Sequence, residues 1–347
     1  MTSTLPLSLG QTIAPEVLKR DFLKLEEMPY DKPEFAYSLV LPQTWTQAKL
    51  PPIDGGLRFD QPTMLSTFVG PADANDDCSM LQVWCQGLRR EISASDWLKN
   101  FLSSGNSSIL DWEVRSPYLA DARVQRQEGN VVLILRLSAR VVGNRLFLVQ
   151  CLASDNSFRD SENIFGLAIA SFKVSQRPDN PHVELWQTHR LDDALTFHAP
   201  LSWVERRPET PVGLDFVELF SLNRSGQPVG ILKAMSLRKK LTTGKNGLDL
   251  PALLASEFAK GGLQLVELAA AESIPLDEPF SKGFHKVWKA TFPTAQIKRE
   301  LNLLVLSMET ATHHFLVGLQ TCAPGQDFYE YAVHRRAFDI VLETLGC

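Results

Sequence analysis

The chain has 347 residues, of which 44% are hydrophobic and 22% are charged, and its formal net charge is −5. Two ordinary domains fit in this length, each with its own core, and the composition is that of a globular protein. The acidic balance and the lack of a basic arm exclude nucleic acid as an expected partner. The apolar runs are too short to span a bilayer, and no basic residue precedes Lys19, so neither stable membrane insertion nor a secretory signal is predicted.

The first 29 residues form a predicted N-terminal extension with one short helical segment, PEVLKRDFLKLEE at 15–27. A first domain is predicted at 30–176, and it opens with an apolar strand that runs into proline, LVLPQTW at 39–45. Proline has no amide donor, so the strand must stop pairing at Pro42. Trp45 is then expected to fold back over the open end of the core, as part of the scaffold.

The middle of this domain predicts a strand, a helix and a second strand. Ser93 or Ser95 can cap the helix, and Gly105 can end it. Two adjacent strands follow, joined by the hairpin turn at 142–144, and an amphipathic helix closes the domain. The predicted ranges, in chain order, are 79–88, 93–105, 109–115, 130–141, 145–154 and 161–174.

The second half repeats this order after a turn-rich linker predicted at 177–189. The second domain, predicted at 190–347, carries FHAPLSW at 197–203, with the same proline and tryptophan spacing as the first half. Matched order over so many elements predicts an internal duplication. The alternative is two unrelated α+β domains that share a short motif by chance. The predicted ranges are 230–237, 248–262, 263–269, 300–310, 313–323 and 329–345.

The predicted fold class is therefore α+β, with two duplicated domains that are each a twisted antiparallel sheet packed by helices. This pattern resembles the PsbP/DcrB-like fold, in which a strand enters L-P-x-x-W and the last helix ends in a Ser-Phe segment. The second half departs from the pattern where Ile340-Val341-Leu342 replaces that ending. The residues that carry the resemblance are Phe35, Leu41, Pro42, Trp45, Phe165, Ala168, Ser171 and Phe172, then Phe197, Pro200, Trp203, Ala337, Phe338 and Leu342.

The members of this family include photosystem subunits, a Ran-binding protein, periplasmic lipoproteins and cytoplasmic bacterial chaperones. Because no export signal is predicted, the resemblance implies the cytoplasmic branch, the effector-associated (Eag-type) chaperones of type VI secretion. In that branch the curved sheet would shield apolar helices of a secreted toxin, usually with two copies of the domain cooperating.

No nucleophile, phosphate-binding or metal-binding motif occurs in the sequence. The only histidine doublet, His313-His314, would place its side chains on opposite faces of a strand, so the pair cannot share one metal. The five cysteines have no framework spacing and are expected to be reduced thiols. We therefore expect no catalytic residues, no metal and no cofactor. The expected function is a non-enzymatic protein-binding module or adaptor in the cytoplasm. The alternative is a structural or assembly subunit, and an enzyme ranks last.

The strand 145–154 and the strand 301–308 are apolar on both faces, whereas a sheet with one wet face should alternate. The second apolar face must meet helices, the sister domain or a partner. Leucines there would bury apolar area, glutamines would exchange hydrogen bonds, and a glycine would admit a partner backbone. A one-residue slip would exchange the faces. The predicted partner-binding residues are Leu146, Leu148, Gln150 and Leu152 in the first half, and His314, Leu316, Gly318 and Gln320 in the second.

Overall fold

In the computed structural model the chain divides into two compact units, Met1–Glu184 (unit 1) and Leu185–Cys347 (unit 2), and each is described by itself. The division falls inside the predicted linker. The structure describes residues 13–53, 55–73, 76–105, 107–192, 194–210, 212–241, 264–268, 282–291 and 300–346, together with Ser256, Ala259, Glu272, Ser273, Glu278 and Phe280.

Unit 1 is built on a seven-stranded antiparallel sheet in the order β3-β4-β5-β9-β8-β7-β6, beside a small sheet in the order β1-β2-β10. The large sheet consists of β3 (Thr46–Gln47), β4 (Thr63–Ala72), β5 (Cys78–Gly87), β6 (Ser107–Ser116), β7 (Leu119–Glu128), β8 (Val131–Val142) and β9 (Arg145–Ser154). The small sheet consists of β1 (Phe22–Glu27), β2 (Tyr37–Pro42) and β10 (Lys173–Val174). The helices are α1 (Pro15–Asp21), α2 (Ala94–Ser103) and α3 (Asp155–Ser171).

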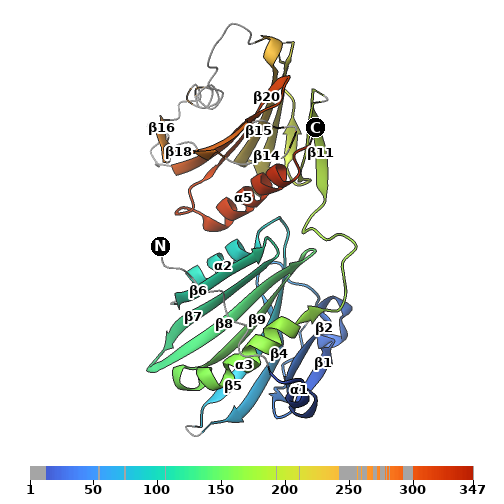
Figure 1. Ribbon diagram of the computed structural model, residues 1–347, viewed down its shortest axis with the longest axis vertical. Helices are drawn as coiled ribbons and strands as arrows, with labels where there is room; N and C mark the ends of the chain where they lie inside the picture. The colour runs from blue at the N-terminus through green and yellow to red at the C-terminus, as the bar shows by residue number, and fades with distance from the viewer. Residues whose placement is uncertain are drawn as a thin grey trace. The chain divides into compact units, whose positions relative to one another are not determined.

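The two long helices of unit 1 lie on opposite faces of the large sheet. Helix α3 crosses one face, where it packs on β5, β8 and β9, as Figure 1 shows in green. Phe158 and Phe165 of α3 and Phe147 and Val149 of β9 belong to the core on that side. Helix α2 packs on β6, β7 and β8. Its Lys99 lies 5.7 Å from the ring of Trp112, which shares the other face. We call that other face the α2 face.

Unit 2 has an eight-stranded sheet with the path β13-β14-β15-β20-β19-β18-β16, a short strand β17 paired with β18, and a separate β11-β12 pair. Helix α5 (Phe328–Glu343), red in Figure 1, packs against β12, β15 and β20. The strands are β11 (Trp186–Leu191), β12 (Leu195–Pro200), β13 (Val204–Arg206), β14 (Leu214–Leu222), β15 (Pro228–Arg238), β16 (Gln264–Glu267), β17 (Glu272–Ser273), β18 (Lys282–Thr291), β19 (Glu300–Glu309) and β20 (His313–Cys322).

The strand path of unit 2 repeats that of unit 1 position by position, with β13 in the place of β3 and β20 in the place of β9. Pro42 and Pro200 end equivalent strands, and the amides of Trp45 and Trp203 donate to the carbonyls of these prolines, each over 3.1 Å. Trp45 packs edge-on to Phe165, and Trp203 is 5% exposed within the core of unit 2. The predicted fold class, with two α+β domains that each have a helix-packed antiparallel sheet, is confirmed, and the tryptophans are part of the cores.

Three features of the fold differ from the sequence prediction. The predicted helix at 15–27 ends at Asp21, because residues 22–27 pair along the whole of β2 as strand β1. Helix α3 begins at Asp155, six residues before the prediction. The strands β4, β7, β14 and β18 were not predicted. Of the helix predicted at 248–262, only Ser256 and Ala259 lie within the described residues, and both are helical.

The outer edge of the unit 1 sheet is β6, which carries two register shifts relative to β7. Each shift leaves one extra residue on β6, Leu110 in the first and Arg115 in the second. Ile109, Leu110 and Val114 are about half exposed on this strand. Bulges of this kind bend and twist an edge strand.

Candidate functional site

The face assignment predicted for β9 agrees with the register of the structure. Phe147, Val149 and Cys151 belong to the core under α3. The four predicted partner-binding residues lie on the α2 face, where each pairs with a residue of β5 and a residue of β8. Gln150, for example, lies between Gln82 of β5 and Leu137 of β8.

These four residues are not equally accessible. Leu146 and Leu148 are each 1% exposed, so they belong to the packed part of the α2 face. Gln150 is partly exposed, and Leu152, 8% exposed, lies beside it at the end of β9. Helix α2 packs on β6, β7 and β8, and Gln150 and Leu152 line an open hollow at the β5 and β9 side of the face.

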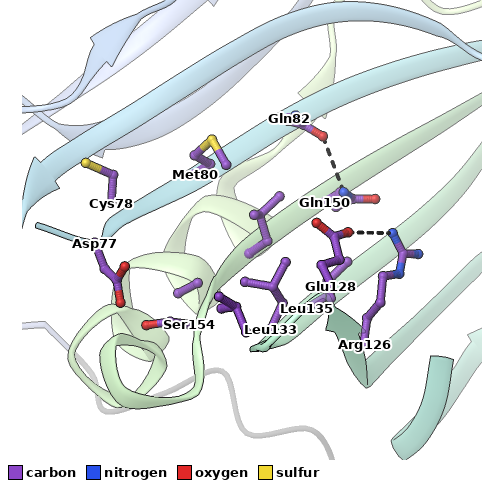
Figure 2. Close-up of a pocket in the computed structure, with 13 residues that line it drawn as sticks. Asp77, Cys78, Met80, Gln82, Arg126, Glu128, Leu133, Leu135, Gln150 and Ser154 are labelled. Atoms are coloured by element: carbon purple, nitrogen blue, oxygen red, sulfur yellow. Dashed lines mark hydrogen bonds and ion pairs between the residues drawn. The ribbon is translucent and has the colours of Figure 1, made fainter. Parts of the chain in front are cut away.

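The hollow has a volume of about 310 Å³ and is drawn in Figure 2. Leucines of β8 and Met80 of β5 supply its apolar wall, and two glutamines stand at one end, where Gln150 Nε2 donates to Gln82 Oε1 over 3.3 Å. Figure 2 shows Asp77, Cys78 and Ser154 at the other end. The residues lining the hollow are Asp77, Cys78, Met80, Gln82, Arg126, Glu128, Val131, Leu133, Leu135, Gln150, Leu152, Ala153 and Ser154.

The charged residues of the hollow stand at its rim. Arg126 lies 3.8 Å from Glu128, and its Nε also donates to Ser107 Oγ over 3.2 Å. The Glu128 side chain is 58% exposed, and Asp77 is partly exposed. The mixture of leucine side chains, side-chain amides and a charged rim is suited to non-covalent binding of a segment that is itself amphipathic.

The buried thiols of unit 1 lie on the opposite face and take no part in the hollow. Burial raises the pKa of Cys85 to about 12, and burial also raises the pKa of Cys151. Thiolate is the reactive form, so both groups are poor nucleophiles. Cys78, at the rim of the hollow, is exposed.

The four predicted residues of the second half also share one face, the face of unit 2 away from α5. Leu316, 1% exposed, belongs to a small cluster with Trp288, Leu303 and Val305. Gly318 is buried between Lys233 of β15 and Val305 of β19. His314 and Gln320, at either end of this row, are partly exposed. At the position equivalent to the Gln82 and Gln150 pair, unit 2 therefore has a lysine and a glycine.

Sequence reasoning missed most of the hollow, although it identified Gln150 and Leu152. Met80 and Gln82 lie within a strand that was predicted, and their alternation with buried Leu81 and Val83 was the available signal. Asp77 lies in the connection before β5, for which no role was predicted. Arg126 and Glu128 belong to β7, which was not predicted.

Neither a metal site nor a membrane span is found in the part of the chain that the structure describes. Among those residues, no cluster of three or more histidine, cysteine, aspartate or glutamate side chains is placed to hold a metal ion. None of the described helices combines the length and apolar character needed to cross a membrane.

No family model matches the chain, and no curated protein matches it. Among solved structures it is similar to cyanobacterial PsbP from Synechocystis sp. PCC 6803, at 14% identity and a TM-score of 0.33 over 48% of this chain and 98% of that chain. It is also similar to the Saccharomyces cerevisiae Ran-binding protein Mog1p, at 9% identity and a TM-score of 0.32 over 47% of this chain and 95% of that chain. It is similar, thirdly, to the type VI secretion immunity protein TplEi from Pseudomonas aeruginosa, at 8% identity and a TM-score of 0.23 over 89% of this chain and 93% of that chain. At these identities and scores, the similarities do not decide what this chain binds.

Proposed function

We propose that the chain is a non-enzymatic protein-binding module of the bacterial cytoplasm that shields apolar segments of a secreted effector. The observation that carries the proposal is the open hollow on the α2 face of unit 1, where leucines lie beside a pair of side-chain amides. The resemblance of the two P-x-x-W repeats to effector chaperones supports the choice of partner.

The amide pair gives the hollow a way to bind polar atoms without a charge. A side-chain amide has two donor hydrogens and an acceptor oxygen. The single bond from Gln150 to Gln82 leaves the oxygen of Gln150 and the amino group of Gln82 able to bind a partner. The leucines beside them would add about 25 cal/mol for each Å² of apolar surface removed from water. The apolar term alone would not distinguish a lipid from a protein, so it is the amide pair that favours an amphipathic protein segment over a wholly apolar lipid.

The second repeat would supply a second contact on the equivalent face of its own sheet. Leu316 and Gly318 would form the apolar floor there, and His314 and Gln320 its polar ends. A tandem copy in one chain would take the place of the two separate copies that cooperate in the chaperones that the sequence resembles. Covalent linkage of two weak sites raises avidity when both can be engaged.

The proposal is tested first by the genome neighbourhood, where we expect a secretion cluster with an effector gene, and then by co-expression with that effector. The soluble yield of that effector is measured with the wild-type chain and with Gln150→Trp, which fills the hollow from a partly exposed position. We expect Gln150→Trp to fold normally and to weaken capture about tenfold or more, which corresponds to about 1.4 kcal/mol. A folded Gln150→Trp variant that protects the effector as well as the wild type would refute the proposal.

Two further variants test whether the contact extends to the buried leucines of each sheet. Leu148→Asp and Leu316→Asp each place a carboxylate at a position that is 1% exposed, so both are expected to lower stability as well as capture. If either variant folded with wild-type stability and lost only capture, the result would mean that the partner contacts the buried leucine itself. The alternative function, a structural or assembly subunit, predicts that the chain remains bound at fixed stoichiometry when the complex is purified. A chaperone, in contrast, would be released when its effector is exported.

A further inference from the structure

The end of unit 1 that holds the hollow carries a marked excess of acidic side chains. The connections β4–β5, β7–β8 and β9–α3 meet there. The start of β5 and the start of β8 both pair with the end of β9, and β7 turns directly into β8. The charged residues of these connections and of the adjoining ends of β7 and α3 are the acids Asp73, Asp76, Asp77, Glu128, Asp155 and Asp160, and the bases Arg126 and Arg159.

The arginine that lines the hollow already has an acidic neighbour, since Arg126 lies 3.8 Å from Glu128. Asp77 lines the hollow and also a second cavity of about 250 Å³ beside Trp45, which Asp73 and Asp160 line as well. Asp73 shapes the turn, because it accepts from the amide of Asp77 and from Ser157 Oγ. Of the remaining acids, only Asp77 and Glu128 line the hollow. Asp76, Asp155 and Asp160 are exposed elsewhere at this end of unit 1, and they add to the negative field that an approaching partner meets.

We infer that the occupant of the hollow is a basic amphipathic segment of the partner protein. This inference rests on the proposed function and names the chemistry of the partner. Leucine-sized side chains of the segment enter the hollow between Met80 and the leucines of β8, and the amide pair binds a polar group of the segment. Lysine or arginine side chains that flank these positions lie against Asp77 and Glu128.

The choice of a basic segment follows from charge complementarity and size. An acidic segment would face like charges at the rim, which slows association and weakens binding. A volume of about 310 Å³ is at the lower limit for small-molecule sites, and it suits one or two side chains of a longer segment. A purely apolar helix would leave the exposed carboxylates of the rim in contact with its hydrocarbon surface.

The test uses the full chain and three fluorescent peptides of equal length. One carries leucine at every third or fourth position with lysine between, the second replaces lysine by glutamate, and the third keeps lysine but replaces leucine by serine. Binding is followed by anisotropy at about 50 and about 300 mM salt, since salt weakens contacts between exposed charges. We expect the leucine–lysine peptide to bind about tenfold or more tightly than either of the others.

The location of binding is read from two independent signals. Cys78 is exposed at the rim of the hollow, so the bound leucine–lysine peptide should slow its alkylation relative to the same protein mixed with the serine peptide. The double variant Asp77→Asn with Glu128→Gln should weaken the leucine–lysine peptide about 3- to 10-fold, the effect of losing two surface ion pairs. Glu209→Gln, an exposed carboxylate of unit 2, is the matched control and should change nothing.

Each possible result bears on the inference. Equal binding of the glutamate peptide with protection of Cys78 overturns the basic character of the partner but leaves the proposed binding function standing. Tight binding of the leucine–lysine peptide that the double variant does not weaken, or that leaves Cys78 unprotected, overturns the site. No binding of any peptide overturns the inference as well, and co-expression with the effector still decides the proposed function.

Discussion

The contact between helix and sheet beside the repeated tryptophan differs between the two units in a way that can be tested. In unit 1, Ser79 of β5 and Ser161 of α3 approach to 2.6 Å between their hydroxyl oxygens. The equivalent residues of unit 2 are Gly230 and His334, since Leu81 and Leu232 occupy the same register and Phe165 and Phe338 the same helical position. A large side chain on the helix in unit 2 thus faces a strand position without a side chain.

The geometry gives the expected cost of each single substitution. A Cβ atom at Gly230 would lie 2.7 Å from His334 Cε1, which is well inside van der Waals contact. Gly230→Ser should therefore cost about 1–3 kcal/mol through overpacking. His334 is fully buried, and its ring nitrogens lie 2.8 Å from Thr321 Oγ1 and 3.0 Å from Ser221 Oγ. His334→Ser should cost about 2–4 kcal/mol, because it opens a cavity and removes a hydrogen-bond partner from both hydroxyls.

The double variant transfers the serine pair of unit 1 into unit 2, so its cost should be well below the sum of the two single costs. We expect a coupling energy of about 1–3 kcal/mol in the favourable direction. Urea denaturation of the full chain and the three variants, with the unfolding transition of unit 2 fitted separately, measures all four free energies. Additive costs would refute the reasoning, because they would mean that the two positions do not compete for the same space.

Three other predictions concern single groups. Arg140 donates to two carbonyls at the end of α3, so Arg140→Gln should cost about 2–3 kcal/mol in urea denaturation, and an unchanged midpoint would contradict this role. Burial lowers the pKa of His189, against the opposing effect of Glu205, so the neutral imidazole is favoured in the folded state. The contribution of neutral His189 to the free energy of unfolding should therefore be complete above about pH 6.5 and fall as the pH drops below that value. His189→Gln should flatten the decrease in melting temperature between about pH 7.5 and about pH 5.5. In the free protein, iodoacetamide should modify exposed Cys78 much faster than buried Cys151, as judged by mass spectrometry of the native chain.

The repeated architecture could be predicted from the sequence because its signals are local. The proline and tryptophan pairs mark equivalent strand ends, and the alternation of β9 assigned its residues to the correct faces. Ser93 was identified as a possible cap, and it accepts from the amide of Asp96 over 3.0 Å. Each of these features depends on residues within a few positions of one another.

The failures depend on contacts between distant parts of the chain. Residues 22–27 have no strong strand pattern, and they become β1 because the edge of β2 is available for pairing. The strand β7 is rich in charged residues, and it was missed because its buried Asp121 does not fit the pattern of an apolar strand. Of the residues that line the hollow, only Gln150 and Leu152 were predicted, because its walls combine β5, β7, β8 and β9 and no single segment shows the combination.

The predicted linker is also more ordered than its turn-rich composition indicates. Within unit 1, the Val183 amide donates to Glu91 Oε1 over 3.0 Å, and the Tyr118 hydroxyl lies 3.2 Å from His182 Nδ1. A Cβ atom at Gly143, where φ is +59°, would lie 2.6 Å from Pro178. These anchors are side-chain and packing contacts from other elements, which composition alone does not reveal.

The two extra residues on β6 bear on the solubility of the protein. An unprotected edge strand of ten residues with half-exposed Ile109 and Val114 could add a strand from another molecule and begin aggregation. The bulges at Leu110 and Arg115 interrupt the row of backbone donors and acceptors, so no long straight stretch remains for a second chain to pair with. Deleting both residues should therefore leave a more regular sheet and a protein that is more prone to aggregate.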